Sequence, residues 1–324
     1  QASAVLVYNW FINLILIIIK LQLLILLCLC WSQVVGQDTL PHFAPEYFQQ
    51  QRFAHRGGYA NGPENTLQTI LFNIGNGVNA LEIDVQLTRD NQLVLFHDRE
   101  IKRVLNSTED KDVEQLSLSE LKAIPLRDTS RGVQYICSLK ELIDTLTILI
   151  PRSEINDFVL EVDFKPHGEH TKDGVNALID ILNTQLPIFG DGFYNHFFIS
   201  TFYPEVLKEL SVADPKIVTA FAVNNSPDKH KLLAKLAIVM APRFIKKYNV
   251  KIIEPNICMV DRRFVRKWSK KGILINAYTA NTSCEKEYLE PYPIAYTTNC
   301  PRQTCQPDPS DQIGKPKNWC KKCN

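Results

Sequence analysis

Eight short runs of β-forming residues, separated by stretches with helical periodicity, occupy most of this 324-residue chain. Such alternation is typical of βαβ units, in which successive strands pair in parallel and a helix crosses between them. Eight units are the number that closes a parallel sheet into a barrel. The sequence therefore predicts an α/β fold, a TIM (β/α)8 barrel. The predicted strands are residues 52–55, 80–88, 158–165, 197–201, 216–222, 250–255, 272–278 and 293–298.

Helical patterns are clear in several of the stretches between these strands. They are residues 65–75, 172–183, 203–212 and 262–271. An added strand is expected at 93–97, and residues 98–149, which are polar and interrupted, are interpreted as a small insertion after the second strand. The apolar stretch 232–245 is short and contains Pro242, so a buried or interfacial helix is favoured over a membrane span.

Residues 10–31 are almost wholly apolar, a length that can cross a bilayer. They form either a signal anchor or, with 21–29 as the hydrophobic region, a cleaved signal peptide. Both interpretations predict a barrel in the lumen or outside the cell, membrane-anchored in the first case and secreted in the second. The expected organisation is a signal anchor or signal peptide, a connector, the barrel domain and a cysteine-rich tail, at residues 1–36, 37–51, 52–301 and 302–324.

Seven of the nine cysteines follow the apolar segment, and four of them lie in the last 25 residues. In an oxidising compartment such a cluster predicts disulfides. The alternative is a zinc site, which is more typical of reducing compartments. Its ligands would be Cys300, Cys305, Cys320 and Cys323. Glycosylation sequons at Asn106 and Asn281 agree with export.

The formal net charge of +1 and the 22% of charged residues provide no basic region for a nucleic acid. The same composition, with 45% hydrophobic residues, is that of a chain able to build a packed core. Nucleic acid is therefore not expected as a partner, and a small-molecule site is.

Carboxylates alternate with apolar residues in two predicted strands. Glu82 and Asp84 share one face of the second strand, and Asp163 and Lys165 share one face of the third. Carboxylates that converge at a barrel mouth favour a hard divalent cation, Mg²⁺ or Ca²⁺. The alternative is a set of ion pairs at the strand ends with Arg56 or Lys165.

Two histidines end predicted strands, His55 the first and His97 the added one. Imidazoles are the natural proton-transfer groups near neutral pH, one as a base and one as an acid. Arg56 offers a planar fork for phosphate oxygens, and Gly57 permits a close backbone approach. Glu64 precedes a predicted helix, so that its position suits either the helix start or a contact with the site.

Taken in their order along the chain, these sequence motifs resemble those of the glycerophosphodiester phosphodiesterase family. The resemblance covers residues 53–301 and includes His-Arg-Gly, Pro-Glu-Asn-Thr, Glu-x-Asp, His-Asp and Asp-x-Lys. Within the family, the chain is most similar to the animal membrane glycoprotein type, which hydrolyses glycerophosphoinositol and related diesters. The resemblance implies a TIM barrel with a small insertion after the second strand, and a divalent metal.

The resemblance also implies a role for each motif residue. It implies metal ligands at Glu82, Asp84 and Asp163, an acid/base pair at His55 and His97, and substrate or phosphate binding at Arg56, Lys165, Glu64 and Tyr278. Two positions depart from the family pattern, because Tyr278 replaces the usual tryptophan and Asn299 replaces an aspartate. The first departure should change substrate packing more than catalysis.

The expected function is therefore metal-dependent hydrolysis of glycerophosphodiesters by a His/His pair. One alternative is a phospholipase of the lysophospholipase D or sphingomyelinase D type, which would need an apolar channel at the mouth. The other is a non-catalytic lumenal binding protein, which would have lost a histidine or a metal ligand. The expected partners are a small-molecule or lysolipid phosphodiester and a membrane, reached through the N-terminal segment.

Overall fold

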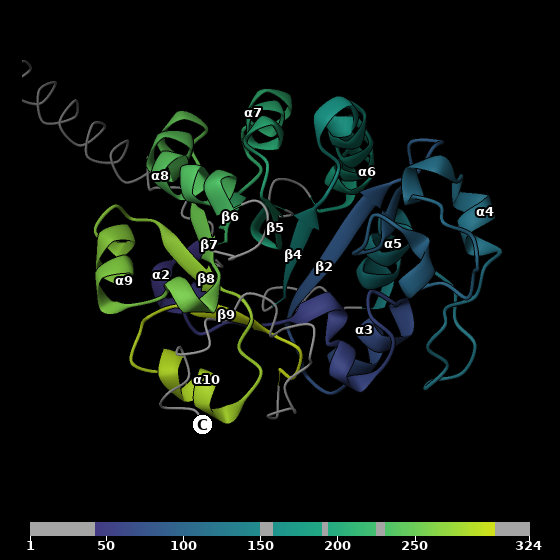
Figure 1. Cartoon of the computed structure of the whole chain (residues 1–324), viewed down its shortest axis with the longest axis horizontal. Helices are drawn as coiled ribbons and strands as arrows, with labels where there is room; N and C mark the ends of the chain where they lie inside the picture. Colours follow the sequence, from purple (N-terminus) through teal and green to yellow (C-terminus); the bar gives the residue numbers. More distant parts are fainter. Residues whose placement is uncertain (1–42, 150–157, 190–193, 225–230, 302–324) are drawn as a thin grey trace, which may run out of the picture. The chain divides into compact units, whose positions relative to one another are not determined.

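The structure, a computed structural model, describes residues 43–149, 158–189, 194–224 and 231–301. Eight parallel strands pair in sequence order, and pairing of β1 with both β9 and β2 closes them into a barrel with helices outside, consistent with a TIM barrel (Figure 1). All eight predicted strands are confirmed. The barrel strands are β1 (Arg52–Ala54), β2 (Ala80–Leu87), β4 (Val159–Phe164), β5 (Phe197–Thr201), β6 (Thr219–Val223), β7 (Ile252–Pro255), β8 (Leu274–Ala277) and β9 (Ala295–Thr298).

The added strand is also present, as β3 (Leu93–Leu95), antiparallel to β2. The four predicted helices are confirmed, although their ends differ from the expected ones. The largest difference is in α6, which extends six residues further than expected. The helices are α2 (Pro45–Phe48), α3 (Leu67–Gly75), α4 (Leu118–Lys122), α5 (Leu139–Leu149), α6 (Thr171–Phe189), α7 (Pro204–Ala213), α8 (Lys231–Lys247), α9 (Arg262–Ser269) and α10 (Ser283–Leu289). Single 3₁₀ turns include η2 (His55–Gly57), η3 (Tyr59–Asn61), η4 (Ile101–Arg103), η5 (Val113–Gln115), η7 (Gly168–His170) and η9 (Ile257–Met259).

The expected insertion, 98–149, divides into two parts. Its first part forms an added unit with a small core of its own, around Ile101 and Leu121. Its last eleven residues form α5, whose Leu139 and Leu142 pack into the main core beside β2 and β4. Because α5 joins that core, it serves as a barrel helix between β3 and β4.

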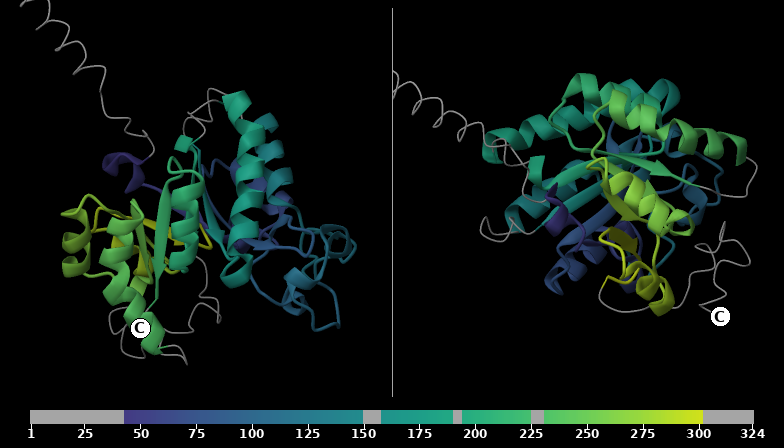
Figure 2. Two further views of the ribbon diagram at one scale, coloured as in Figure 1. Left: turned by 90° about the horizontal axis from the view of Figure 1, so that it is seen from above. Right: turned by 90° about the vertical axis from the view of Figure 1, so that its left-hand side faces the viewer.

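Phenylalanine side chains pack together at the end of the barrel where the strands begin. Phe48 of α2 lies against Phe53 of β1 and Phe198 of β5, with ring centroids 5.9 and 6.0 Å apart, and Phe43 also contacts Phe198. The chain therefore enters the barrel across its strand-start end. Figure 2 (left) shows α2 toward one end of the barrel and the added unit toward the other.

Several predictions concern parts of the chain outside the described residues. These parts are the N-terminal segment 1–36, the first residues of the connector and the tail 302–324. Within the described ranges, no helix combines the length and the apolar character that crossing a membrane requires. The buried residues of α8, Ala241 and Ile245, pack into the core between α8 and α9, which agrees with a partly buried helix. Cys137 carries a free thiol.

Candidate active site

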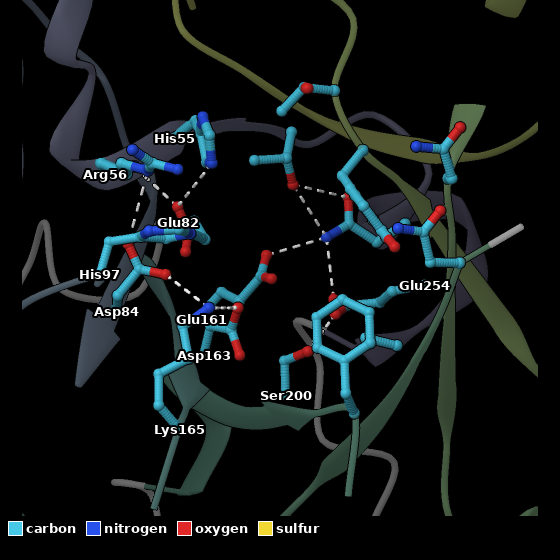
Figure 3. A pocket seen from close by; sticks show the side chains of 18 residues that line it. His55, Arg56, Glu82, Asp84, His97, Glu161, Asp163, Lys165, Ser200 and Glu254 are labelled. Carbon is cyan, nitrogen blue, oxygen red and sulfur yellow. Dashed lines mark hydrogen bonds and ion pairs between the residues drawn. The ribbon is translucent and has the colours of Figure 1, made fainter. Parts of the chain in front are cut away.

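The two acidic strands lie side by side in register. Glu82 of β2 is level with Glu161 of β4, and Asp84 is level with Asp163, one step nearer the strand ends. One ligand oxygen from each of Glu82, Asp84 and Asp163 lies within 4.8 Å of the others (Figure 3). The parallel register therefore brings together the three carboxylates that the sequence predicts as metal ligands.

This cluster is costly to hold as a set of charges. Burial raises the pKa of Glu82, and the neighbouring Asp84 and Asp163 carboxylates raise it further. Burial would also raise the pKa of Asp84, but Lys165, His97 and Arg56 lower it more. Asp163 Oδ1 is buried with no hydrogen-bond partner among the described residues. A buried, all-oxygen donor set with an unpartnered oxygen fits a hard divalent cation.

Two cations flank the carboxylates, as in the ion pairs considered above. Lys165 Nζ lies 2.9 Å from Asp84 Oδ1 and also contacts Asp163 Oδ2. The backbone N–H of Arg56, which has a φ of 51°, donates to Glu82 Oε2 at 2.6 Å. The Arg56 Nε is 3.7 Å from Asp84 Oδ2. Both cations line the same pocket as the carboxylates, so both can meet a phosphate there.

His55 is held by an amide. Its Nδ1 lies 2.7 Å from Asn299 Oδ1, and Asn299 Nδ2 donates to the Tyr59 hydroxyl at 2.8 Å. This network assigns the proton to Nδ1 of His55 and leaves the lone pair on Nε2, which is 4.0 Å from Glu82 Oε2. Burial, and then the charge of Arg56, lower the pKa of His55 to about 3. His55 is therefore a neutral imidazole whose Nε2 can accept a proton.

His97 is held by a carboxylate instead. Its Nδ1 lies 2.7 Å from Asp98 Oδ1, and Arg103 binds both oxygens of Asp98. Burial would raise the pKa of Asp98, but its bonds with His97 and Arg103 hold it below the ordinary range. An ionised carboxylate at Nδ1 orients the ring. The two histidines thus have partners of different charge.

Glu64 is not among the residues that line the pocket with the carboxylates, and its contact with substrate stays a prediction. Its carboxylate binds Arg103 through two bonds of 2.6 and 2.8 Å and Arg56 through one of 3.1 Å. The cap of α3 is the Thr66 hydroxyl, which accepts from the Thr69 N–H. Glu64 therefore positions the guanidinium of Arg56 beside the acidic cluster.

The other eight predicted site residues line one pocket of about 280 Å³. They are His55, Arg56, Glu82, Asp84, His97, Asp163, Lys165 and Tyr278. Other residues line the deeper part, where Asn276 Nδ2 donates to Glu161 Oε2 at 2.8 Å and to Glu254 Oε1 at 3.0 Å. Burial raises the pKa of Glu254 to about 7.

One supporting residue lies at the start of the predicted helix 65–75 and was not singled out as a site residue. The Asn65 side chain donates to Asp84 Oδ2 at 2.8 Å and accepts from the Asp84 N–H at 3.1 Å. Its backbone has a φ of 53°, a conformation that asparagine tolerates better than most residues. The Pro-Glu-Asn-Thr motif was the signal in the sequence that could have identified Asn65. Its bond to Asp84, 19 positions away, cannot be seen in the sequence.

Comparison with known proteins decides the family. Residues 55–295 match the glycerophosphoryl diester phosphodiesterase family. The chain belongs to this family. It is therefore a phosphoric diester hydrolase, and the resemblance seen in the sequence is confirmed.

Relatives of this glycerophosphodiester phosphodiesterase are found among animals and bacteria. Glycerophosphodiester phosphodiesterase 1 of mouse and of human are each 25% identical to it over 276 residues, which is 78% of this chain and 79% of the relative. A solved putative enzyme from Silicibacter pomeroyi has a TM-score of 0.67 at 17% identity, covering 78% of this chain and 90% of that one. A phosphodiesterase from Oleispira antarctica, solved with the product sn-glycerol-3-phosphate, has a TM-score of 0.63 at 20% identity, covering 78% and 93%.

The contact between Asn65 and Asp84 generates a prediction about metal binding. Asn65→Gly keeps the positive φ and removes the amide that orients Asp84, so the affinity for Mg²⁺ or Ca²⁺ should fall about 10- to 100-fold. Isothermal titration calorimetry with each ion measures the change. The control is Asn91→Gly, which replaces an exposed asparagine with a φ of 58°. Equal affinities in the two variants would contradict a supporting role for Asn65.

Proposed function

We propose that this phosphodiesterase hydrolyses glycerophosphodiesters in a metal-dependent reaction with His55 and His97 as the acid/base pair. The observation that supports it most is the difference between the two imidazoles. His55 has an amide at Nδ1 and a lone pair at Nε2, whereas His97 has a carboxylate at Nδ1. A base and an acid are the two proton-transfer groups that phosphodiester cleavage needs.

The roles follow from these partners. His55 Nε2 takes the proton of the attacking hydroxyl, which belongs to water or to the glycerol of the substrate. Protonated His97 gives its Nε2 proton to the oxygen of the leaving alcohol as the phosphorus–oxygen bond breaks. Arg56 and Lys165 offset the charge on the phosphate oxygens. Asn299 and Asp98 hold the two rings in the required tautomer and orientation.

Glu82, Asp84 and Asp163 are the residues that would hold Mg²⁺ or Ca²⁺. A divalent ion bound there supplies Lewis-acid stabilisation of the phosphate charge. Without a cation, the three buried carboxylates repel one another. Burial raises the pKa of Glu82, and this repulsion from Asp84 and Asp163 raises it further. Oxygen ligands favour these hard ions over zinc.

We propose glycerophosphodiesters with polar head groups, including glycerophosphoinositol, as the substrates. Most residues that line the pocket are polar, and the apolar side chains among them are Phe202, Ala222 and the ring of Tyr278. The lysophospholipase D or sphingomyelinase D alternative would require an apolar channel for a lipid chain. The alternative of a non-catalytic binding protein would require a lost catalytic group, and both histidines and all three carboxylates line the pocket.

The compartment is a further proposal. An anchored or secreted enzyme with its barrel in the lumen or outside the cell is supported by the apolar run at 10–31. We also propose that Cys284 and Cys300 are disulfide-bonded, which agrees with an oxidising compartment.

Replacement of either histidine tests the acid/base assignment. His55→Ala and His97→Ala should each lower kcat about 10²- to 10⁴-fold on glycerophosphoinositol, because each removes one proton transfer. The matched control is His170→Ala, since His170 lies outside the pocket beside Glu114 and should leave kcat unchanged. Steady-state kinetics at saturating metal give the comparison. Full turnover in His55→Ala would refute the mechanism.

A matched pair of substrates tests the class of diester. Glycerophosphoinositol and lysophosphatidylinositol share a head group and differ by one acyl chain, so their comparison isolates the lipid chain. The polar lining predicts a kcat/KM at least about tenfold higher for glycerophosphoinositol, because the acyl chain would leave buried polar groups unpaired. The measurement uses lysolipid below its micellar concentration. Equal or higher kcat/KM for the lysolipid would favour the phospholipase alternative.

A further inference from the structure

Five consecutive strands place their penultimate residues on one wall of the active-site pocket. Inward positions of a parallel barrel are usually filled by bulky apolar side chains, but four of these five residues are polar. Figure 3 shows two of them, Ser200 and Glu254, across the pocket from His55 and Glu82. We call the five residues, together with Thr279 just after β8, the opposite wall. The five are Ser200, Ala222, Glu254, Asn276 and Thr297, of β5 to β9 in order.

The carboxyl groups at this wall are held by neutral donors. Asn276 Nδ2 donates to Glu254 Oε1 at 3.0 Å and to Glu161 Oε2 of β4 at 2.8 Å, and the Ser200 hydroxyl donates to Glu254 Oε2. The two carboxyl groups also share a hydrogen bond. These bonds use fewer than the roughly eight acceptor positions of two carboxyl groups. The wall therefore keeps acceptors for a hydrogen-bond donor in the pocket.

Thr279 adds a hydroxyl group without a partner. The residue lines the pocket and is 9% exposed, and its Oγ1 forms no hydrogen bond with any described residue. Asn256, which follows β7, also lines the pocket. Its Oδ1 accepts from the Cys258 N–H at 3.0 Å, whereas its Nδ2 has no partner in the described part of the chain. Buried polar groups normally form hydrogen bonds, so the partner of Thr279 comes from what occupies the pocket.

Two aromatic rings lie beside these polar groups. Phe202 directly follows β5, and Tyr278 directly follows β8. Their rings pack edge to face with centroids 6.0 Å apart, and both line the pocket. The Tyr278 hydroxyl donates to the Val223 carbonyl at 3.1 Å, so the ring rather than the hydroxyl is available to a ligand. The pocket thus offers apolar surface for a carbon skeleton next to polar groups for its substituents.

A polyol matches this combination of groups. Each hydroxyl group both donates and accepts a hydrogen bond, so neighbouring hydroxyls can donate to Glu161 or Glu254 and accept from Asn256. The Thr279 hydroxyl can pair with either function. A lipid chain in the same place would leave these buried groups unpaired, which is costly.

We propose that the opposite wall binds neighbouring hydroxyl groups of the substrate's polyol, its glycerol or its inositol head group, while the phosphate lies at the acidic cluster. The proposal rests on the proposed function, which places the phosphate there. It makes Glu254, Asn276 and Thr279 specificity-determining residues, which contact hydroxyl groups and take no part in proton transfer.

Binding of phosphate monoesters to the full chain tests the proposal without turnover. Each polyol phosphate is paired with a hydroxyl-free counterpart, sn-glycerol 3-phosphate with propyl phosphate and inositol 1-phosphate with cyclohexyl phosphate. Isothermal titration calorimetry at saturating Mg²⁺ or Ca²⁺ should show at least about tenfold tighter binding of the polyol in one pair or both, because a site that pairs with hydroxyl groups rejects analogues that lack them. The pair that shows this preference identifies the polyol.

Thr279→Val removes one hydroxyl group and keeps the shape of the side chain. It should reduce the preference for the polyol about fivefold, the size of one hydrogen bond, and leave the affinity for the hydroxyl-free counterpart unchanged. Glu254→Gln, which keeps its shape and loses an acceptor, should also reduce the preference. The control Thr129→Val changes an exposed threonine outside the pocket and should keep it.

Equal affinities within both pairs in the wild type would overturn the proposal. So would an unchanged preference in both variants, or an equal loss of affinity for the two members of a pair, which a structural defect would cause. Tighter binding of phosphoethanolamine than of either polyol phosphate would also overturn it, because the wall would then pair with an ammonium group. Diester turnover, measured separately, distinguishes the two proposals: a polyol preference without turnover contradicts the proposed function alone, and turnover without the preference contradicts the opposite wall alone.

Discussion

The parallel pairing of β2 with β4 is the constraint on which the site depends. It places Asp84 level with Asp163 and leaves Glu82 one step deeper, so three carboxylates share a volume too small for three unpaired charges. The neighbouring groups offset that repulsion, with Lys165 between two of the carboxylates and the Arg56 N–H on the third. A divalent ion bound there would offset the remaining negative charge of the carboxylates. The positive charges that stabilise the carboxylates also stabilise the negative charge of a phosphate.

A second constraint concerns the two imidazoles. Each is oriented through Nδ1, His55 by Asn299 at the end of the last barrel strand and His97 by the next residue in the chain, Asp98. Arg103 of the added unit binds both Asp98 and Glu64, so one guanidinium connects the partner of His97 with the carboxylate behind Arg56. The added unit therefore supports the site as well as extending the barrel.

Alternation of strand and helix patterns was enough to predict the barrel, because strand periodicity and strand number are local properties of a sequence. Eight of the nine candidate site residues line one pocket for a related reason, since polar residues at strand ends meet at one barrel mouth. The bond between Glu64 and Arg103 joins residues 39 positions apart, and nothing in the sequence indicated it. The bond between His55 and Asn299 spans 244 residues, and the Asn276 bridge between Glu161 and Glu254 also joins distant strands. Such pairings exist only in the closed barrel and cannot be inferred from the sequence alone.

The central claim is that Glu82, Asp84 and Asp163 hold a divalent ion that phosphodiester hydrolysis requires. Turnover of glycerophosphoinositol by chelated, metal-free enzyme, followed by addition of Mg²⁺ or Ca²⁺, tests it most directly. The account predicts at least about a hundredfold loss on chelation, recovery with one of the two ions, and no recovery in Glu82→Gln, which keeps the shape of the side chain and removes its charge. Full turnover in the presence of excess chelator, or recovery by metal in Glu82→Gln equal to that of the wild type, would contradict it.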